Sequence, residues 1–292
     1  MIAVEPRSRK IGPYVDVLPA LKDRGSYDDR VNASEASGPA LRGLVVDWGG
    51  VLTPSLDGAM AAWAQRDAVE YEHFQGVLRA WVRRPGDDGS DGEALAGDAG
   101  GMVDVLTDSS GSPDDGPMAD LEQAADSGPV GRSPVHKLER GEISVPDFEH
   151  ELAAALASRG SVVAAEGLLD RMLSGLVALD DDMLGLVRRA RARGIRTALL
   201  SNSWGNHYPE QLWDGLFDAI VISGRVGMRK PEPEIFRYTC EKLQLPPSNC
   251  VMVDDLPHNV HGAVAVGMVA VRHRAFAETA AELEILFDLP LR

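Results

Sequence analysis

The sequence predicts an α/β fold in which helices cover both faces of a parallel sheet. Short apolar runs without alternation recur in the second half of the chain, and helical patterns separate them. A strand without alternation is buried on both faces, as in parallel sheets. Strands that alternate with helices are joined by right-handed crossovers. Together these features predict a Rossmann-like sheet, and the long interval after the first strand predicts an inserted α-helical cap.

The first strand is predicted at residues 41–47, where branched apolar residues lead into Asp47 and the pair Gly49-Gly50. Amphipathic spacing then predicts helices within 58–84, at 135–139, after Ser144 and at 164–176. Ser144 and Asp147 form a capping-box-like start, with Asp in place of the usual Glu. These helices assign residues 58–177 to the cap.

The second half predicts the rest of the core, which comprises residues 41–57 and 178–292. Helices are predicted at 181–193, 233–243 and 258–266, with a helical turn at 209–216, and strands at 197–200, 219–223, 250–253 and 269–271. Gly194 and Gly267 follow two of these helices as C-caps.

Two segments lack the pattern of a folded element. Residues 1–40 mix Pro, Gly, Ser and balanced charges, and are predicted to be a disordered N-terminal extension. Residues 85–134 hold twelve acidic residues, one basic residue and ten of the thirty glycines. Such a segment buries too little apolar surface to offset its chain entropy, so it is predicted to be a disordered acidic insertion.

The composition is that of an ordinary globular protein, with 44% hydrophobic and 25% charged residues in 292. The formal charge is -16, and the acidic insertion supplies -11 of it. No cluster of Lys and Arg indicates nucleic-acid binding, and no run of eighteen apolar residues indicates a membrane span. Cys240 and Cys250 are expected to be buried thiols, and the protein is expected to be cytoplasmic.

Polar residues follow several predicted strands. Because the carboxyl ends of parallel strands share one edge of a sheet, these residues are expected to converge. A carboxylate on a glycine turn can act as a nucleophile, beside backbone N–H groups that bind oxyanions. A lysine can stabilise developing negative charge, and clustered carboxylates call for a hard cation such as Mg²⁺. The residues concerned are Asp47, Gly49, Gly50, Ser201, Asn202, Lys230, Asp254 and Asp255.

In their order and spacing these residues resemble the four motifs of the haloacid dehalogenase-like hydrolase superfamily. Ser201 precedes Lys230 by 29 residues, and Lys230 precedes Asp254 by 24. The local sequences Gly227-Met228-Arg229-Lys230-Pro231 and Val253-Asp254-Asp255 resemble the branch whose helical cap is inserted after the first motif. The resemblance covers residues 41–84 and 134–275.

The resemblance implies a role for each residue. Asp47 would be the nucleophile that forms an aspartyl-phosphate, and Lys230 would pair with it. Ser201 and Asn202 would hold the phosphoryl group, near the backbone of Gly49 and Gly50. The implied Mg²⁺ ligands are Asp47, the Gly49 carbonyl, Asp254 and Asp255. The implied activity is that of a phosphoric monoester hydrolase acting on a small phosphorylated molecule.

One position departs from the family pattern. Phosphatases of the family usually place a second aspartate two residues after the nucleophile as general acid and base, and this chain has Gly49 there. General acid–base help is typically worth about 10²–10⁴ in rate. Two alternatives therefore stay open, a metal-independent 2-haloacid dehalogenase and a non-catalytic phosphate-binding domain.

Four nearby residues are interpreted more simply. Trp48 and Trp204 are expected to pack beside the motifs or to line the substrate pocket. His258 is expected to be a solvated residue at a helix start, and Arg140 a charge at a helix end.

Overall fold

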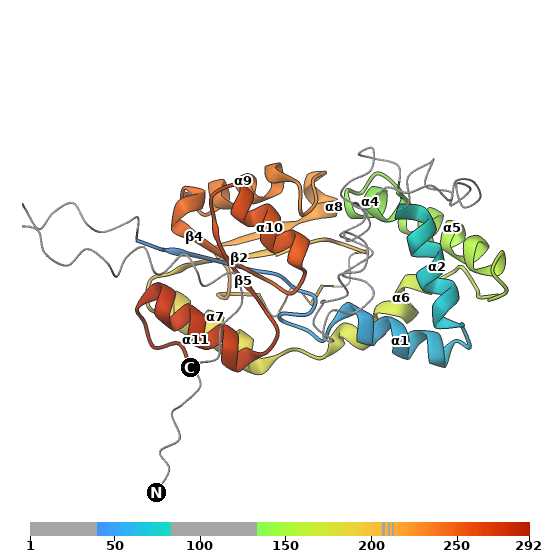
Figure 1. Ribbon diagram of the computed structural model, residues 1–292, viewed down its shortest axis with the longest axis horizontal. Coiled ribbons are helices and arrows are strands. Elements are labelled where there is room, and N and C mark those ends of the chain that lie inside the picture. Colours follow the sequence, from blue (N-terminus) through green and yellow to red (C-terminus); the bar gives the residue numbers. More distant parts are fainter. Residues whose placement is uncertain (1–39, 83–132, 206–207, 210, 212) are drawn as a thin grey trace, which may run out of the picture. The chain divides into compact units, whose positions relative to one another are not determined.

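Five parallel strands form the central sheet of the computed structural model (Figure 1), which describes residues 40–82, 133–205, 208–209, 211 and 213–292. The strand order is β3-β2-β1-β4-β5, so β1 lies in the centre. The strands are β1 (Gly43–Val46), β2 (Arg196–Ser201), β3 (Ala219–Ile222), β4 (Cys250–Asp254) and β5 (Val269–Arg272). The predicted parallel sheet is thus confirmed.

Helices cover both faces of this sheet (Figure 1). On one face α7 (Asp181–Ala192) and α11 (Phe276–Phe287) pack against alternate strand residues such as Leu44 and Val46. On the other face α9 (Pro233–Lys242) and α10 (Pro257–Ala265) pack against the intervening residues, including Val45. The sheet is therefore buried on both sides, which explains why its strands show no alternation.

The helices inserted between β1 and α7 bury an apolar cluster of their own. They are α1 (Leu56–Arg66), α2 (Tyr71–Val82), α4 (Pro134–Glu139), α5 (Val145–Ala157) and α6 (Leu168–Leu173), followed by a 3-10 turn at Ser174–Val177. Trp63, Phe74 and Phe148 are fully buried in this cluster. Ser144 caps α5 by accepting a hydrogen bond from the Asp147 N–H at 3.2 Å, as its sequence predicts.

Several local predictions differ from the structure. The first strand spans Gly43–Val46 rather than 41–47, and in the range predicted as a helical turn residues 213–216 form a hydrogen-bonded turn. A short helix, α8 (Ser223–Val226), begins at the predicted end of a strand, and α11 has no counterpart among the predicted helices. The expected disorder at 1–39 and 85–132 lies outside the described residues.

Two further predictions concern the described residues. Cys240 and Cys250 are free and buried, as expected for structural thiols. None of the helices in the described part of the chain combines the length and the hydrophobicity of a membrane span.

Candidate active site

The ends of the three central strands bring the predicted residues together. Asp47 follows β1, Ser201 ends β2 and Asp254 ends β4. Because β1 pairs with both β2 and β4 in register, these ends lie at one edge of the sheet. The backbone N–H of Asp47 donates to the carbonyl of Val253 at 3.0 Å and so extends the pairing by one residue. The convergence follows directly from the parallel topology.

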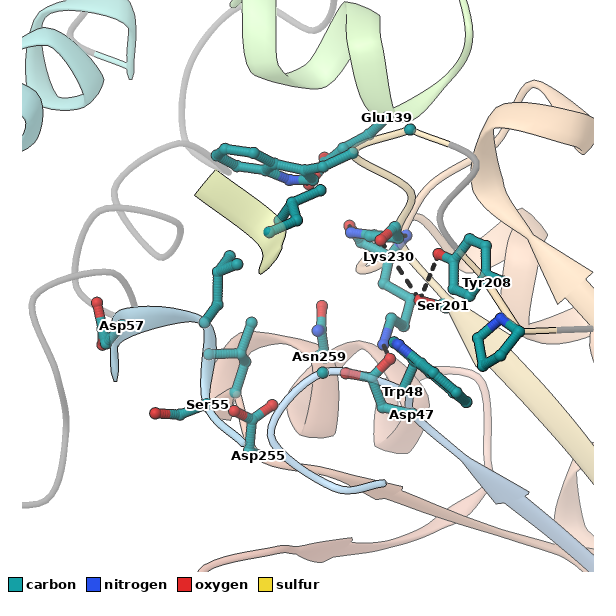
Figure 2. Close-up of a pocket in the computed structure, with 18 of the residues that line it drawn as sticks. Asp47, Trp48, Ser55, Asp57, Glu139, Ser201, Tyr208, Lys230, Asp255 and Asn259 are labelled. Carbon is teal, nitrogen blue, oxygen red and sulfur yellow. Dashed lines mark hydrogen bonds and ion pairs between the residues drawn. The ribbon is translucent and has the colours of Figure 1, made fainter. Parts of the chain in front are cut away.

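Lys230 lies between two of the carboxylates. Its ammonium group is 2.8 Å from Asp47 Oδ1 (Figure 2) and 2.6 Å from Asp254 Oδ2. The Lys230 side chain is 1% exposed. The Asn202 side chain fixes its backbone, because Oδ1 accepts from the Lys230 N–H at 2.8 Å and Nδ2 donates to the Lys230 carbonyl at 3.0 Å. Asn202 therefore holds the backbone of the lysine, and the phosphate contact that the resemblance implies stays a prediction.

The electrostatics of this cluster favour a charged lysine and disfavour a charged Asp47. Burial raises the pKa of Asp47 to about 7, because the lowering effect of Lys230 is smaller and Asp254 adds repulsion. Burial alone would lower the pKa of Lys230, but the carboxylates of Asp254 and Asp47 raise it above its usual value. The Lys230 ammonium group thus contacts two buried carboxylates at once.

Asp47, Asp254 and Asp255 form a cluster with the chemistry of a metal site. Each offers a carboxylate oxygen, and these oxygens lie within 4.8 Å of one another. Asp254 is held in place because its Oδ1 accepts hydrogen bonds from the Leu256 N–H and from Asn259 Nδ2, both at 3.0 Å. Hard oxygen ligands and clustered negative charge are what Mg²⁺ requires, so the residues fit this ion.

The two glycines after Asp47 differ in what surrounds them. Gly50 has φ +72°, and a Cβ there would clash with Asp255 Oδ2, so the close approach of this turn to Asp255 requires glycine. Gly49 has no positive φ, and a Cβ there would meet no heavy atom within 4 Å. Gly49 borders open space in the pocket, where a side chain could fit.

Aromatic residues build the wall next to Ser201. Tyr208 Oη is 3.0 Å from Ser201 Oγ (Figure 2), and burial raises the tyrosine pKa above its usual value. The Tyr208 ring packs against Trp48 and Trp213, with centroids 5.7 and 5.4 Å away. Trp48 therefore both packs, as expected, and lines the pocket.

Asp47, Ser201 and Lys230 open into one pocket of about 670 Å³ (Figure 2). Its floor is the edge of the sheet, and part of its wall comes from the inserted helices. From the sheet edge, its loops and the start of α10 come Asp47, Trp48, Gly49, Ser55, Ser201, Asn202, Trp204, Gly205, Tyr208, Pro209, Gln211, Lys230, Asp255, Leu256 and Asn259. From the inserted helices and the turn after α6 come Leu56, Asp57, Glu139, Asp170, Leu173 and Ser174.

Charged residues join the inserted helices to the loop that carries Lys230. Glu139, at the end of α4, forms a buried ion pair with Arg229, and its Oε1 accepts from Trp204 Nε1 at 3.1 Å. The next residue, Arg140, pairs with Glu232. Arg140 is only 9% exposed, so it is a buried bridge rather than a simple helix-end charge.

His258 is also buried. The sequence suggests a solvated histidine at a helix start, and His258 does lie in the first turn of α10, but only 5% of it is exposed. The solvated interpretation is wrong, because the helix start packs into the protein.

Three residues of the site are not identified by the sequence motifs. Tyr208, Asn259 and Glu139 contact Ser201, Asp254 and Arg229, from which they are separated by seven, five and ninety residues. Asn259 carries the one usable signal, since it lies in the first turn of α10, shortly after the acidic pair.

Comparison with known proteins agrees with this geometry. The family model described as haloacid dehalogenase-like hydrolase matches residues 41–267. The chain is 31% identical over 155 residues to the sesquiterpene phosphatase astK of Aspergillus oryzae, covering 51% of this chain and 77% of that protein. It is 31% identical over 99 residues to the N-acylneuraminate-9-phosphatase of Rattus norvegicus, covering 32% of this chain and 40% of that protein.

A solved structure supports the fold. A dehalogenase crystallised with an intermediate complex is 17% identical, with a TM-score of 0.50, and the match covers 88% of this chain and all of that one. At this identity the likeness shows the fold alone. The family match spans most of the chain and includes every strand end described above except that of β5. The chain belongs to the haloacid dehalogenase-like hydrolase family.

Proposed function

We propose that this hydrolase is a Mg²⁺-dependent phosphatase of a small phosphomonoester, with Asp47 as its nucleophile and the inserted helices as its cap. The observation that carries the proposal is the contact of Lys230 with Asp47 and Asp254 beside Asp255, at the floor of a pocket. The phosphatase names of two relatives, astK and the rat N-acylneuraminate-9-phosphatase, support it.

In the proposed reaction an Asp47 oxygen attacks phosphorus, and the bond between phosphorus and the ester oxygen breaks. The leaving oxygen takes the electron pair and gains a proton from water or from a carboxyl group of the inserted helices, because position 49 offers no carboxyl group. Water then attacks the aspartyl-phosphate, which releases phosphate and restores the Asp47 carboxylate. Lys230 balances charge on the carboxylate and on the transferring oxygens.

Asp47, Asp254, Asp255 and the Gly49 carbonyl would hold Mg²⁺. When bound, the ion would neutralise the carboxylates and the phosphoryl charge. Ser201 would donate to a phosphoryl oxygen, and the N–H groups of the Gly49-Gly50 turn would lie near the same group. Asn202 would keep Lys230 in place through its two backbone hydrogen bonds.

The test is phosphate release from a panel of phosphomonoesters, with Mg²⁺ and with EDTA, by the full chain and by Asp47→Asn. We expect release that needs Mg²⁺ and is lost in Asp47→Asn. Release that survives the substitution would refute the role of Asp47. Tight phosphate-ester binding without any release would instead establish a non-catalytic binding domain.

Gly49 favours one alternative, because a dehalogenase needs no acid for its halide leaving group. In that reaction Asp47 would displace halide from a 2-haloacid, and water would hydrolyse the resulting ester. The acidic cluster argues against it, since three carboxylates repel an anionic haloacid. Halide release from 2-chloropropionate in the presence of EDTA would decide in its favour.

A further inference from the structure

The pocket is larger than a phosphoryl group alone requires. At about 670 Å³ it falls in the middle of the range of roughly 300–1,000 Å³ typical of sites for drug-sized ligands. The residues around Asp47 account for the phosphoryl group. The rest of the pocket is therefore available to the alcohol portion of the ester.

The charges of the wall select against an anionic alcohol portion. Among the described residues that line the pocket, Lys230 is the one Lys or Arg, and Asp47 and Asp254 already contact it. The inserted helices add the acids Asp57 and Asp170 to the lining, whereas the charge of Glu139 is already paired with Arg229. A second phosphate or a carboxylate on the alcohol portion would meet these acids without a matching cation in the lining.

Four polar side chains of the wall already form hydrogen bonds within the protein. Both ends of the Asn202 amide bind the Lys230 backbone, and Tyr208 Oη contacts Ser201 Oγ. Trp204 Nε1 donates to Glu139, and Ser174 Oγ donates to the Arg171 carbonyl at 2.8 Å. A sugar hydroxyl placed against these four groups would compete with hydrogen bonds that they already make, and a hydroxyl buried without a partner loses affinity.

The remaining wall is apolar. Large apolar or aromatic side chains surround the space beyond Asp47, and they come from the core and from the inserted helices alike. They are Trp48, Leu56, Leu173, Trp204, Tyr208 and Leu256. Packing against Trp48 and Trp213 holds Tyr208 in place, so this part of the surface is preformed.

We propose that the substrate is the monophosphate of an uncharged, largely apolar alcohol. The inference rests on the proposed phosphatase function and adds the class of alcohol. The phosphate would lie at Asp47 and Lys230, and the hydrocarbon would extend along Leu56 and Leu173 between the sheet edge and the inserted helices. Sugar phosphates, phosphorylated carboxylic acids and nucleotides are the classes that this wall disfavours.

The test compares kcat/KM in Mg²⁺ for n-alkyl phosphates from ethyl to decyl with that for glucose 6-phosphate, 3-phosphoglycerate and AMP. Complete burial of a methylene is worth up to about fourfold. We expect kcat/KM to rise along the alkyl series until the pocket is full, and decyl phosphate to exceed the polar substrates at least tenfold. A flat series, or a polar substrate that equals decyl phosphate, would overturn the inference.

Two substitutions test whether the alkyl chain contacts the proposed apolar wall. Leu173→Gln should flatten the dependence on chain length, because it places an amide on the apolar wall. Ile285→Gln is the matched control, since Ile285 in α11 is 74% exposed and lies outside the pocket. An unchanged slope in a folded Leu173→Gln protein would remove Leu173 from the proposed path and overturn the assigned wall.

p-Nitrophenyl phosphate separates the two levels of the proposal. Hydrolysis of this compound, together with equal kcat/KM values along the n-alkyl series, would support the phosphatase function and reject the apolar substrate. No phosphate release from any compound would reject both.

Discussion

Restoring the missing carboxylate at position 49 tests the proton-transfer step directly. The Gly49 backbone lies outside the left-handed region, and a Cβ there meets no heavy atom within 4 Å, so Gly49→Asp should fold without a clash. Gly49 borders the same pocket as Asp47 and Lys230, so the new carboxyl group would lie near the leaving oxygen. General acid catalysis is typically worth about 10²–10⁴ in rate. We expect the lower end, about 10², because no neighbouring side chain fixes the rotamer of the new residue.

The gain should depend on the leaving group. An alkoxide needs a proton as it leaves, whereas p-nitrophenolate is stable without one. Gly49→Asp should therefore raise kcat for alkyl phosphates by about 10² and change it little for p-nitrophenyl phosphate. The assay is steady-state phosphate release for both substrates at saturating Mg²⁺.

Gly49→Asn is the matched control, because it has nearly the same shape without the carboxyl group. Equal rates for the Asp and Asn variants on alkyl phosphates would show that the new carboxyl group does not donate a proton. An equal gain on both classes of substrate would point to positioning or charge instead of acid catalysis, and would refute the reasoning. A fourth carboxylate near Asp47 should also lower the melting temperature without Mg²⁺ more than Gly49→Asn does.

Four other predictions follow from the contacts of the site. Gly50→Ala should destabilise the fold by about 1–2 kcal/mol because alanine is strained in the left-handed backbone conformation of Gly50. The clash of the new Cβ with Asp255 Oδ2 should add to this loss, which urea unfolding would measure. Asn202→Ala removes both hydrogen bonds to the Lys230 backbone and should lower kcat more than it raises KM, with about 1–3 kcal/mol lost in stability. Mg²⁺ should raise the melting temperature, because a hundredfold excess over Kd stabilises the folded state by about 2.7 kcal/mol. Asp255→Asn should reduce this shift. An unchanged melting temperature would argue against the metal site. Glu139→Leu leaves Arg229 buried without this carboxylate and should cost about 3–5 kcal/mol, whereas combining it with Arg229→Met should recover most of that loss in chemical denaturation.

The sheet and its catalytic edge are predictable because each depends on local signals. Continuous apolar runs identify buried parallel strands, and the residue that follows such a run must lie at the carboxyl edge. The amino-acid sequence alone therefore groups Asp47, Ser201 and Asp254, and the register of β1 with β2 and β4 confirms the grouping. Among the helices that cover the sheet, α11 escapes prediction because it has neither a side-chain cap, as α7 has, nor a proline in its first turn, as α9 and α10 have.

The supporting contacts are not predictable, because they depend on packing between segments far apart in the chain. Glu139 lies on α4 and Arg229 on the loop before α9, and nothing in either local sequence indicates a partner. The family resemblance implies that Asn202 helps Ser201 to hold the phosphoryl group. The double contact of Asn202 with the Lys230 backbone emerges only when the loops are placed side by side.

The loop after β2 links the catalytic centre to the inserted helices. Ser201 contacts Tyr208 on the pocket wall, and Asn202 holds the backbone of Lys230. Two residues further on, Trp204 donates to Glu139, which pairs with Arg229 next to the same lysine. Lys230 is thus constrained from the sheet edge through Asn202 and from the inserted helices through Arg229. Because both constraints act on one short segment, a shift of the inserted helices relative to the sheet would be transmitted to the lysine that faces Asp47, and substrate contacts on those helices would thereby affect kcat as well as KM.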